Sequence, residues 1–105
     1  MTTLTQDQKP YYADPMYEDQ LVWACLTSPD FYLRLGRRLN PDMLAQPHAK
    51  TLLRGAAVVY ANTKRVPANP GIVLQRLTSL RNDGKLSDSE LLPARAWVAE
   101  YEASN

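Results

Sequence analysis

Cys25 and His48 carry the side chains best suited to nucleophilic or metal chemistry, and each is the single residue of its kind in the chain. A thiol and an imidazole within hydrogen-bonding reach form a nucleophile pair. Cys25, however, falls on the apolar side of an expected helix, which favours a buried structural thiol. One cysteine and one histidine cannot form a zinc site alone.

His48 directly follows Pro47, in the first turn of an expected helix. We expect a structural histidine that hydrogen-bonds the preceding loop. Two alternatives stay open: a contact with a partner protein, and a role in binding a metal or moving a proton.

The carboxylates are scattered along the chain, and no pair of them is placed for acid–base catalysis. Many stand at expected helix starts, where the helix dipole stabilises a negative charge. The phosphate-binding pattern G-x-x-x-x-G-K-[ST] does not occur in the sequence. We therefore expect no catalytic residues, no metal, no cofactor and no enzyme activity in this chain by itself.

Length and composition predict one soluble domain. The chain has 105 residues, of which 45% are hydrophobic and 22% charged, and its net charge is +1. Proteins that bind nucleic acid usually carry a basic excess, so we expect contact with DNA only through other proteins. A lone cysteine, a polar start and the lack of a long apolar run predict a cytoplasmic protein without a membrane segment.

Proline follows a residue that can cap a helix at five places, and each pair is expected to open a helix. Proline suits the first helical position because its missing N–H would have no partner there, and Asp, Ser and Asn cap the orphan amides. Glutamine is the weakest of these caps. The five pairs are Asp14-Pro15, Ser28-Pro29, Asn40-Pro41, Gln46-Pro47 and Asn69-Pro70.

Two stretches are expected to act as structural joints that set helix angles. The first joins a short helical turn to a long helix at 47–63, through Asp42, Pro47 and His48. The second is Asn69 with Pro70, at the start of the following helix. We assign these joints no bond-making role.

Apolar residues at helical spacing predict the buried face of each helix. Gly55 costs about 1 kcal/mol within a helix, so it marks a close helix crossing beside the small patch Ala56-Ala57. The expected apolar stripes are Tyr17, Leu21, Val22, Cys25 and Leu26; Phe31, Leu35 and Leu39; Ala49, Leu52, Leu53, Ala56, Ala57 and Tyr60; Ile72, Val73, Leu77 and Leu80; and Ala94, Trp97, Val98 and Tyr101.

The C-terminal part of the sequence predicts a sixth helix. Asp83-Gly84 ends the fifth helix, Ser87 and Glu90 form a capping box, and Pro93 is expected to kink or restart the helix. No segment shows the alternation of a strand. We therefore expect an all-α fold, a compact orthogonal bundle of five or six short helices at 14–105, with a flexible N-terminal tail at 1–13.

Trp23, Trp97 and Tyr101 are the candidate interface residues. Trp23 lies nearly opposite Leu21 on the first expected helix. An outward tryptophan is a typical interface anchor, whereas the alternative is that neighbouring helices cover both faces of this helix. The sequence favours neither.

The order of these elements resembles the N-terminal collar domain of replicative DNA helicases of the DnaB type. The family's first helix has the form A-E-x-x-V-L-G-x-L, and residues 17–26, YEDQLVWACL, are similar to it. Its Asp-Phe-Tyr-x-x-Pro-His segment resembles residues 42–48, DMLAQPH. The aromatic pair is replaced by Met43-Leu44, and Trp23-Ala24 stand where small residues are usual.

The later motifs follow in the same order. The family's G-x-P-I-D loop and L-x-x-x-L helix resemble residues 65–69, RVPAN, and 73–77, VLQRL, with Asn69 in place of the acid. A G-x-L close resembles residues 84–86, GKL. The similarity spans about residues 15–101, and the ordered set of motifs identifies a divergent member of the family.

The resemblance implies a non-catalytic assembly module. In such helicases this domain forms a collar of paired domains above the ATPase ring and helps to dock primase or a loader. The implied partners are the chain itself as a homodimer, helicase subunits, primase and loader. The family's domain ends in a helical hairpin used for pairing, of which residues 94–103 would be the first helix.

Two other functions remain as alternatives. The chain could be a stand-alone helical protein that binds or inhibits a replicative helicase. It could also be a helical DNA-binding regulator, because a short turn precedes the long helix, although the near-zero net charge disfavours this.

Overall fold

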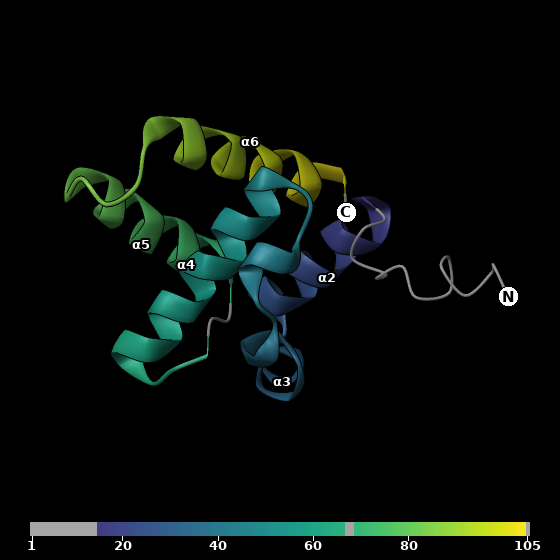
Figure 1. Cartoon of the computed structure of the whole chain (residues 1–105). Coiled ribbons are helices and arrows are strands. Elements are labelled where there is room, and N and C mark those ends of the chain that lie inside the picture. The colour runs from purple at the N-terminus through teal and green to yellow at the C-terminus, as the bar shows by residue number, and fades with distance from the viewer. Residues whose placement is uncertain (1–14, 67–68, 105) are drawn as a thin grey trace, which may run out of the picture.

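Residues 15–66 and 69–104 are described by a computed structural model (Figure 1). Each of its α-helices begins beside a start signal seen in the sequence. Within these ranges the secondary structure consists of helices and turns, which confirms the all-α prediction. The expected tail at 1–13 and the cap Asp14 lie outside the described residues. The elements are α2 (Pro15–Thr27), α3 (Pro29–Arg34), η2 (Gly36–Arg38), η3 (Pro41–Met43), α4 (Pro47–Thr63), α5 (Pro70–Asn82) and α6 (Asp88–Ser104).

Side-chain caps form at three of the predicted proline starts. In each, a side-chain oxygen accepts a hydrogen bond from a backbone amide of the first turn, which has no partner within the helix. The bonds run from Phe31 N–H to Ser28 Oγ (3.2 Å), from Asp42 N–H to Asn40 Oδ1 (3.0 Å) and from Ile72 N–H to Asn69 Oδ1 (3.1 Å). These prolines therefore begin helices rather than break them.

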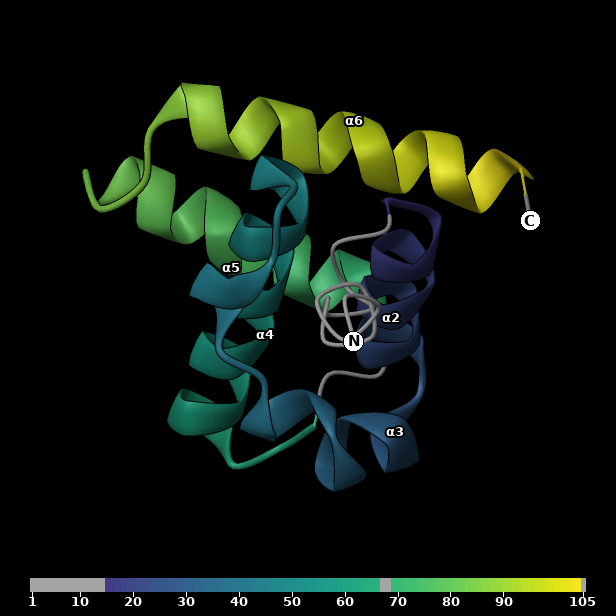
Figure 2. The ribbon, with the colours of Figure 1, turned by 45° about the vertical axis from the view of Figure 1, so that its right-hand side comes forward.

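α4 is the central element of the fold and packs against α2, α5 and α6. Its buried residues include Ala49, Leu52, Leu53 and Ala56, as the apolar spacing predicts. Figure 2 shows α6 lying across the ends of α2 and α4, with α3 at the opposite end of the molecule. The core therefore surrounds α4 on several sides.

Gly55 marks the crossing of α4 and α5, as the sequence predicts. A Cβ atom at this position would lie 2.9 Å from side-chain atoms of both Val73 and Leu77 on α5. The prediction that Ala56 and Ala57 form a small-residue patch beside this crossing was only half right, because Ala56 is buried whereas Ala57 is exposed. The glycine therefore permits the close approach, with Ala56 beside it.

The second expected helix is shorter than predicted, and a different face of it is buried. α3 ends at Arg34, Leu35 is exposed, and the buried side chain is Tyr32. A Cβ atom at Gly36 would lie 2.7 Å from the Tyr32 ring and 2.8 Å from Cys25 Sγ. The tyrosine therefore fills the space beneath the turn, and only a glycine fits there.

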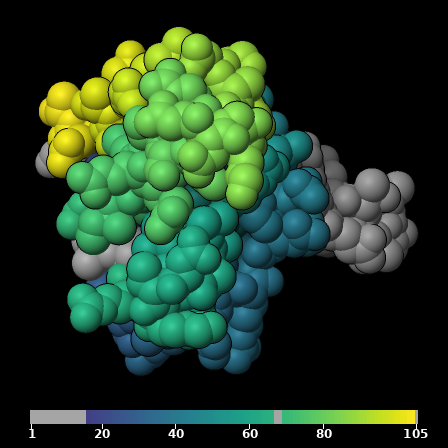
Figure 3. Space-filling view, turned by 90° about the vertical axis from the view of Figure 1, so that its left-hand side faces the viewer, coloured from purple at the N-terminus to yellow at the C-terminus, as the bar shows by residue number. Residues whose placement is uncertain are grey.

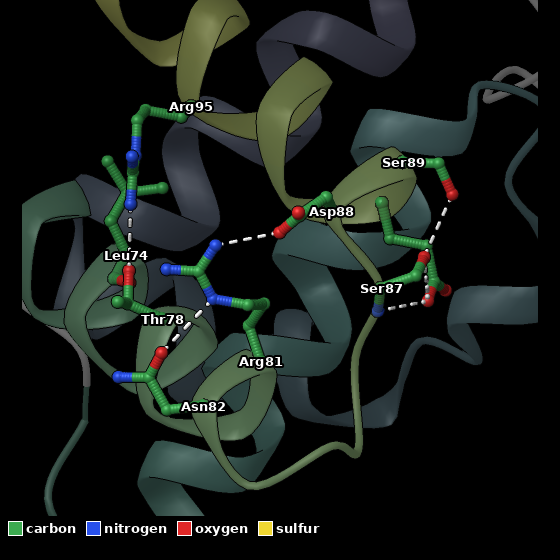
Figure 4. Close-up of polar contacts among 9 residues, drawn as sticks. Leu74, Thr78, Arg81, Asn82, Ser87, Asp88, Ser89 and Arg95 are labelled. Carbon is green, nitrogen blue, oxygen red and sulfur yellow. Dashed lines mark hydrogen bonds and ion pairs between the residues drawn. The ribbon is translucent and has the colours of Figure 1, made fainter.

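The α5–α6 corner is a tight turn closed by polar contacts (Figure 4). Gly84 has a positive φ of 76°, a conformation that favours glycine at a helix end. Arg81 Nη1 donates to Asp88 Oδ1 at 2.7 Å, and Arg95 Nη2 donates to Thr78 Oγ1 at 3.0 Å. These bonds tie α5 to α6 on both sides of the corner.

The start of α6 confirms the predicted participation of Glu90 in a capping box. Its carboxylate accepts hydrogen bonds from the backbone N–H of Ser87 at 3.2 Å and from the Ser87 hydroxyl at 3.1 Å. These bonds lower the pKa of Glu90. The helix does not restart at Pro93, because α6 is continuous from Asp88 to Ser104.

Candidate functional site

Glu18 on α2 is a fully buried carboxylate that holds the start of α4. Its side chain is 0% exposed. The backbone N–H groups of Ala45 and Gln46 each donate to one of its oxygens, at 2.8 Å. The negative charge also lies at the positive end of the α4 dipole. Glu18 therefore satisfies amides at a helix start where the Gln46 side chain makes no cap bond.

Asp19, the next residue on α2, binds two side chains at the same helix start. Its Oδ1 accepts a hydrogen bond from Gln46 Nε2 at 2.9 Å and lies 3.1 Å from His48 Nε2. Through these contacts, Glu18 and Asp19 on α2 hold the segment Ala45–His48 in place. We call this set of contacts the α2–α4 clamp.

The clamp corrects the prediction for His48. Its hydrogen-bonding partner is Asp19 on α2, 29 positions earlier in the chain, rather than the loop that precedes α4. The ring also stacks on Trp97 of α6, with centroids 5.1 Å apart and an interplanar angle of 22°. His48 therefore contacts both α2 and α6, and its position is a structural one.

The three candidate interface residues and His48 form one aromatic cluster centred on Trp97: Trp23, His48, Trp97 and Tyr101. Tyr101 stacks on Trp97 with ring centroids 4.8 Å apart. Trp23 packs edge-on against Trp97 at 5.9 Å and lies 5.1 Å from Tyr101. Trp23 is thus covered by α6, the second of the two arrangements considered. All four rings keep partial exposure.

Of the other predicted joint residues, Pro47 lies within the segment that the clamp holds, whereas Asp42, Asn69 and Pro70 lie outside it. Asp42 is exposed, and its Oδ1 lies 3.9 Å from Arg54 Nη2. Pro47 is the first residue of α4. Asn69 caps α5 and Pro70 is buried in its first turn. The first predicted joint therefore lies at the starts of η3 and α4, and the second lies at the start of α5.

Cys25 is the buried thiol that the sequence predicts. Its side chain is 0% exposed, and burial raises the pKa of the thiol to about 12. The thiol therefore stays protonated at neutral pH, and its close neighbours are Tyr32 and Gly36.

Glu18 and Asp19 are the site residues that the sequence analysis missed. A signal was present, because Glu18 shares a helix face with Leu21, Val22 and Cys25, all buried. An acid within an apolar stripe indicates a buried carboxylate with a partner. The prediction began this stripe at Tyr17, which is 41% exposed.

Searches for other kinds of site and for relatives gave negative results. Within 15–66 and 69–104, no three histidine, cysteine or acidic residues are grouped so that they could hold a metal ion. In the same ranges no helix has the length and apolar character needed to cross a membrane. Comparisons with models of protein families, with curated proteins and with solved structures found no match.

Proposed function

We propose that this chain is a non-catalytic protein-interaction module of a DnaB-like replicative helicase, which serves in oligomerisation and in docking primase or a loader. One observation carries the proposal. Two of the stretches that resemble the helicase collar domain, residues 17–26 and 42–48, meet in the α2–α4 clamp through Glu18, Asp19 and His48. If these two stretches resembled the family by chance, nothing would require them to contact each other in the structure.

The outer face of α6 supports a role in self-association. Leu92, Ala96, Ala99 and Ala103 recur at helical spacing on this face and are all exposed. Leu92 is 55% exposed. Small residues allow a second helix to approach closely, and the resemblance implies pairing through this part of the chain. We call this surface the α6 outer face.

The test combines self-association with partner binding. Sedimentation analysis over a concentration series measures the oligomeric state, and a pull-down assays the helicase, primase and loader of the same replication system. We expect concentration-dependent association or retention of one of these proteins. Ala99→Arg should abolish self-association, because a charge on the α6 outer face would be desolvated at the interface.

Ala61→Arg is the matched control, since Ala61 is exposed on α4. Both variants should keep the thermal stability of the parent chain. A chain that stays monomeric at all concentrations and retains none of the three proteins would contradict the proposal.

A further inference from the structure

Charge is strongly segregated along this chain, although the net charge is only +1. Residues 43–82, which include α4 and α5, contain no aspartate or glutamate. They contain six basic residues, Lys50, Arg54, Lys64, Arg65, Arg76 and Arg81, so the charge of this stretch is +6. All 11 acidic residues lie before or after it. All the formally charged side chains of α4 and α5 are therefore basic.

Among the residues that the structure describes, acidic side chains from other elements neutralise two of these charges. Arg54 lies 3.6 Å from Glu90, and Arg81 lies 2.7 Å from Asp88. Lys50, Lys64, Arg65 and Arg76 form no ion pair within the described part of the chain. Lys64 caps the C-terminal end of α4 and so complements its dipole. Arg76 lies in the middle of α5, where no helix end accounts for its charge.

A groove between α4 and α5 is lined by one of these unneutralised residues, Arg76, and Lys64 and Arg65 directly follow its lining residue Thr63 in the chain. Its volume is about 260 Å³, below the roughly 300–1,000 Å³ of pockets that hold a whole small ligand. Ile72 is 40% exposed in it. Figure 3 looks onto the side of the molecule where α4 and α5 meet. The lining residues are Val59, Thr63, Ile72, Gln75, Arg76 and Ser79. We call this feature the α4–α5 groove.

We infer that the α4–α5 groove docks an acidic peptide segment of a partner protein. Ile72 and Val59 offer an aliphatic seat for an apolar side chain of the peptide. Arg76 within the groove, with Lys64 and Arg65 directly after the lining residue Thr63, would face its carboxylates. Charge complementarity therefore selects an acidic partner, and the aliphatic seat selects one with an apolar anchor.

The same observations disfavour single-stranded nucleic acid as the occupant. Bases are usually held by stacking on aromatic rings, and the lining of the groove contains none. The inference rests on the proposed function only in treating the chain as a module that docks proteins. It requires no helicase, primase or loader.

A selection from a random short-peptide library tests the inference. The folded chain is the bait, and the Arg76→Glu variant is used for counter-selection. We expect enriched peptides to combine aspartate or glutamate with leucine, isoleucine or phenylalanine. Enrichment of neutral or basic peptides, or no enrichment over the counter-selected variant, would overturn the inference.

Backbone NMR shifts and fluorescence anisotropy then locate and quantify binding of one selected peptide. Shifts should concentrate at the groove residues. Arg76→Glu should weaken binding at least about tenfold, since charge reversal replaces attraction by repulsion. Because Arg76 is half-buried, the exposed pair Lys64→Glu with Arg65→Glu provides a second variant. Lys85→Glu changes the net charge by as much as Arg76→Glu does, but it lies beyond the C-terminal end of α5. This control should leave affinity within about twofold.

The remaining outcomes separate the inference from the proposed function. A thymidine oligonucleotide that binds as tightly as the peptide, through the same residues, would assign the groove to nucleic acid and overturn the inference. Concentration-dependent shifts of the free chain in the groove would assign it to a second copy, with the same consequence. The Ala99→Arg variant should bind the peptide normally, so loss of helicase binding alone does not affect the inference.

Discussion

At the scale of single residues, Glu18 shows how a distant side chain can cap a helix. The first amides of a helix lack partners within it, and Pro47 removes one donor. The Gln46 side chain donates to Asp19 instead of capping α4. The backbone N–H groups of Ala45 and Gln46, which lie just before the first residue of α4, donate to Glu18, whose burial is possible because both of its oxygens are bonded.

Glu18→Gln should destabilise the fold by about 2–4 kcal/mol, because hydrogen bonds to a buried charge are the strong ones and an amide nitrogen cannot accept from an N–H. Chemical denaturation measures the free energy of unfolding. Glu102→Gln, at an exposed position on α6, is the control and should change it by less than about 0.5 kcal/mol. Equal effects of the two substitutions would show that the clamp does not stabilise the fold.

Cys25 makes stability depend on pH in the alkaline range. Burial raises the pKa of the folded thiol from its ordinary value of 9.0 to about 12. Above pH 9 the unfolded chain loses a proton that the folded chain retains. The contribution of Cys25 to the free energy of unfolding is thus fully present below pH 9. It is lost as pH rises toward 12, by at most about 1.4 kcal/mol per pH unit.

Denaturation of the parent chain and of Cys25→Ala across this pH range measures the effect of the thiol together with its coupling to Tyr32, whose pKa the Cys25 charge raises. The free energy of unfolding should fall more steeply with pH in the parent. Parallel pH profiles would show that the thiol ionises as readily in the folded chain as in the unfolded one.

At the scale of elements, the crossing of α4 and α5 depends on Gly55. Glycine is unfavourable inside a helix, so its presence here needs a tertiary reason. The Val73 and Leu77 side chains occupy the space that a Cβ atom would need. The crossing also brings together the two helices that line the α4–α5 groove, so the groove depends on this crossing.

Gly55→Leu should destabilise the fold by about 1–3 kcal/mol or more, because a larger side chain must displace buried neighbours. Ala57→Leu on the same helix is the matched control. Ala57 is exposed, so this substitution should be nearly neutral. Thermal unfolding of both variants measures the difference, and a Gly55→Leu variant as stable as its control would contradict the close crossing.

At the scale of the whole molecule, the described helices share one hydrophobic core. α4 contacts α2, α5 and α6, and the aromatic cluster joins α2 to α6 through Trp23, Trp97 and Tyr101. No helix of this set could leave without exposing residues of another. The fold is thus expected to unfold as one unit.

Tryptophan fluorescence and far-UV circular dichroism should report the same unfolding transition. Trp23 and Trp97 sense the junction of α2 and α6, whereas circular dichroism senses all helices together. Coincident midpoints are the expected result for a two-state domain. A fluorescence transition that comes first would mean that α6 detaches before the rest unfolds.

Some of this structure follows from the sequence alone because its causes are local. A proline at the first helical position and a side-chain cap act within a few residues, so the helix starts were predictable. Periodic apolar residues likewise predicted α4 at 47–63, which matches Pro47–Thr63. The positive φ of Gly84 favours glycine, so the end of α5 was also predictable.

Contacts between distant residues were decided only by the tertiary structure. The partner of His48 lies 29 positions away on α2, and the two amides bound by Glu18 lie 27 and 28 positions away. Trp23 is covered because α6 returns across α2, and Tyr32 is buried because Gly36 leaves room for its ring. Such contacts depend on the angles at which helices pack, and these angles result from the fit of all the side chains together.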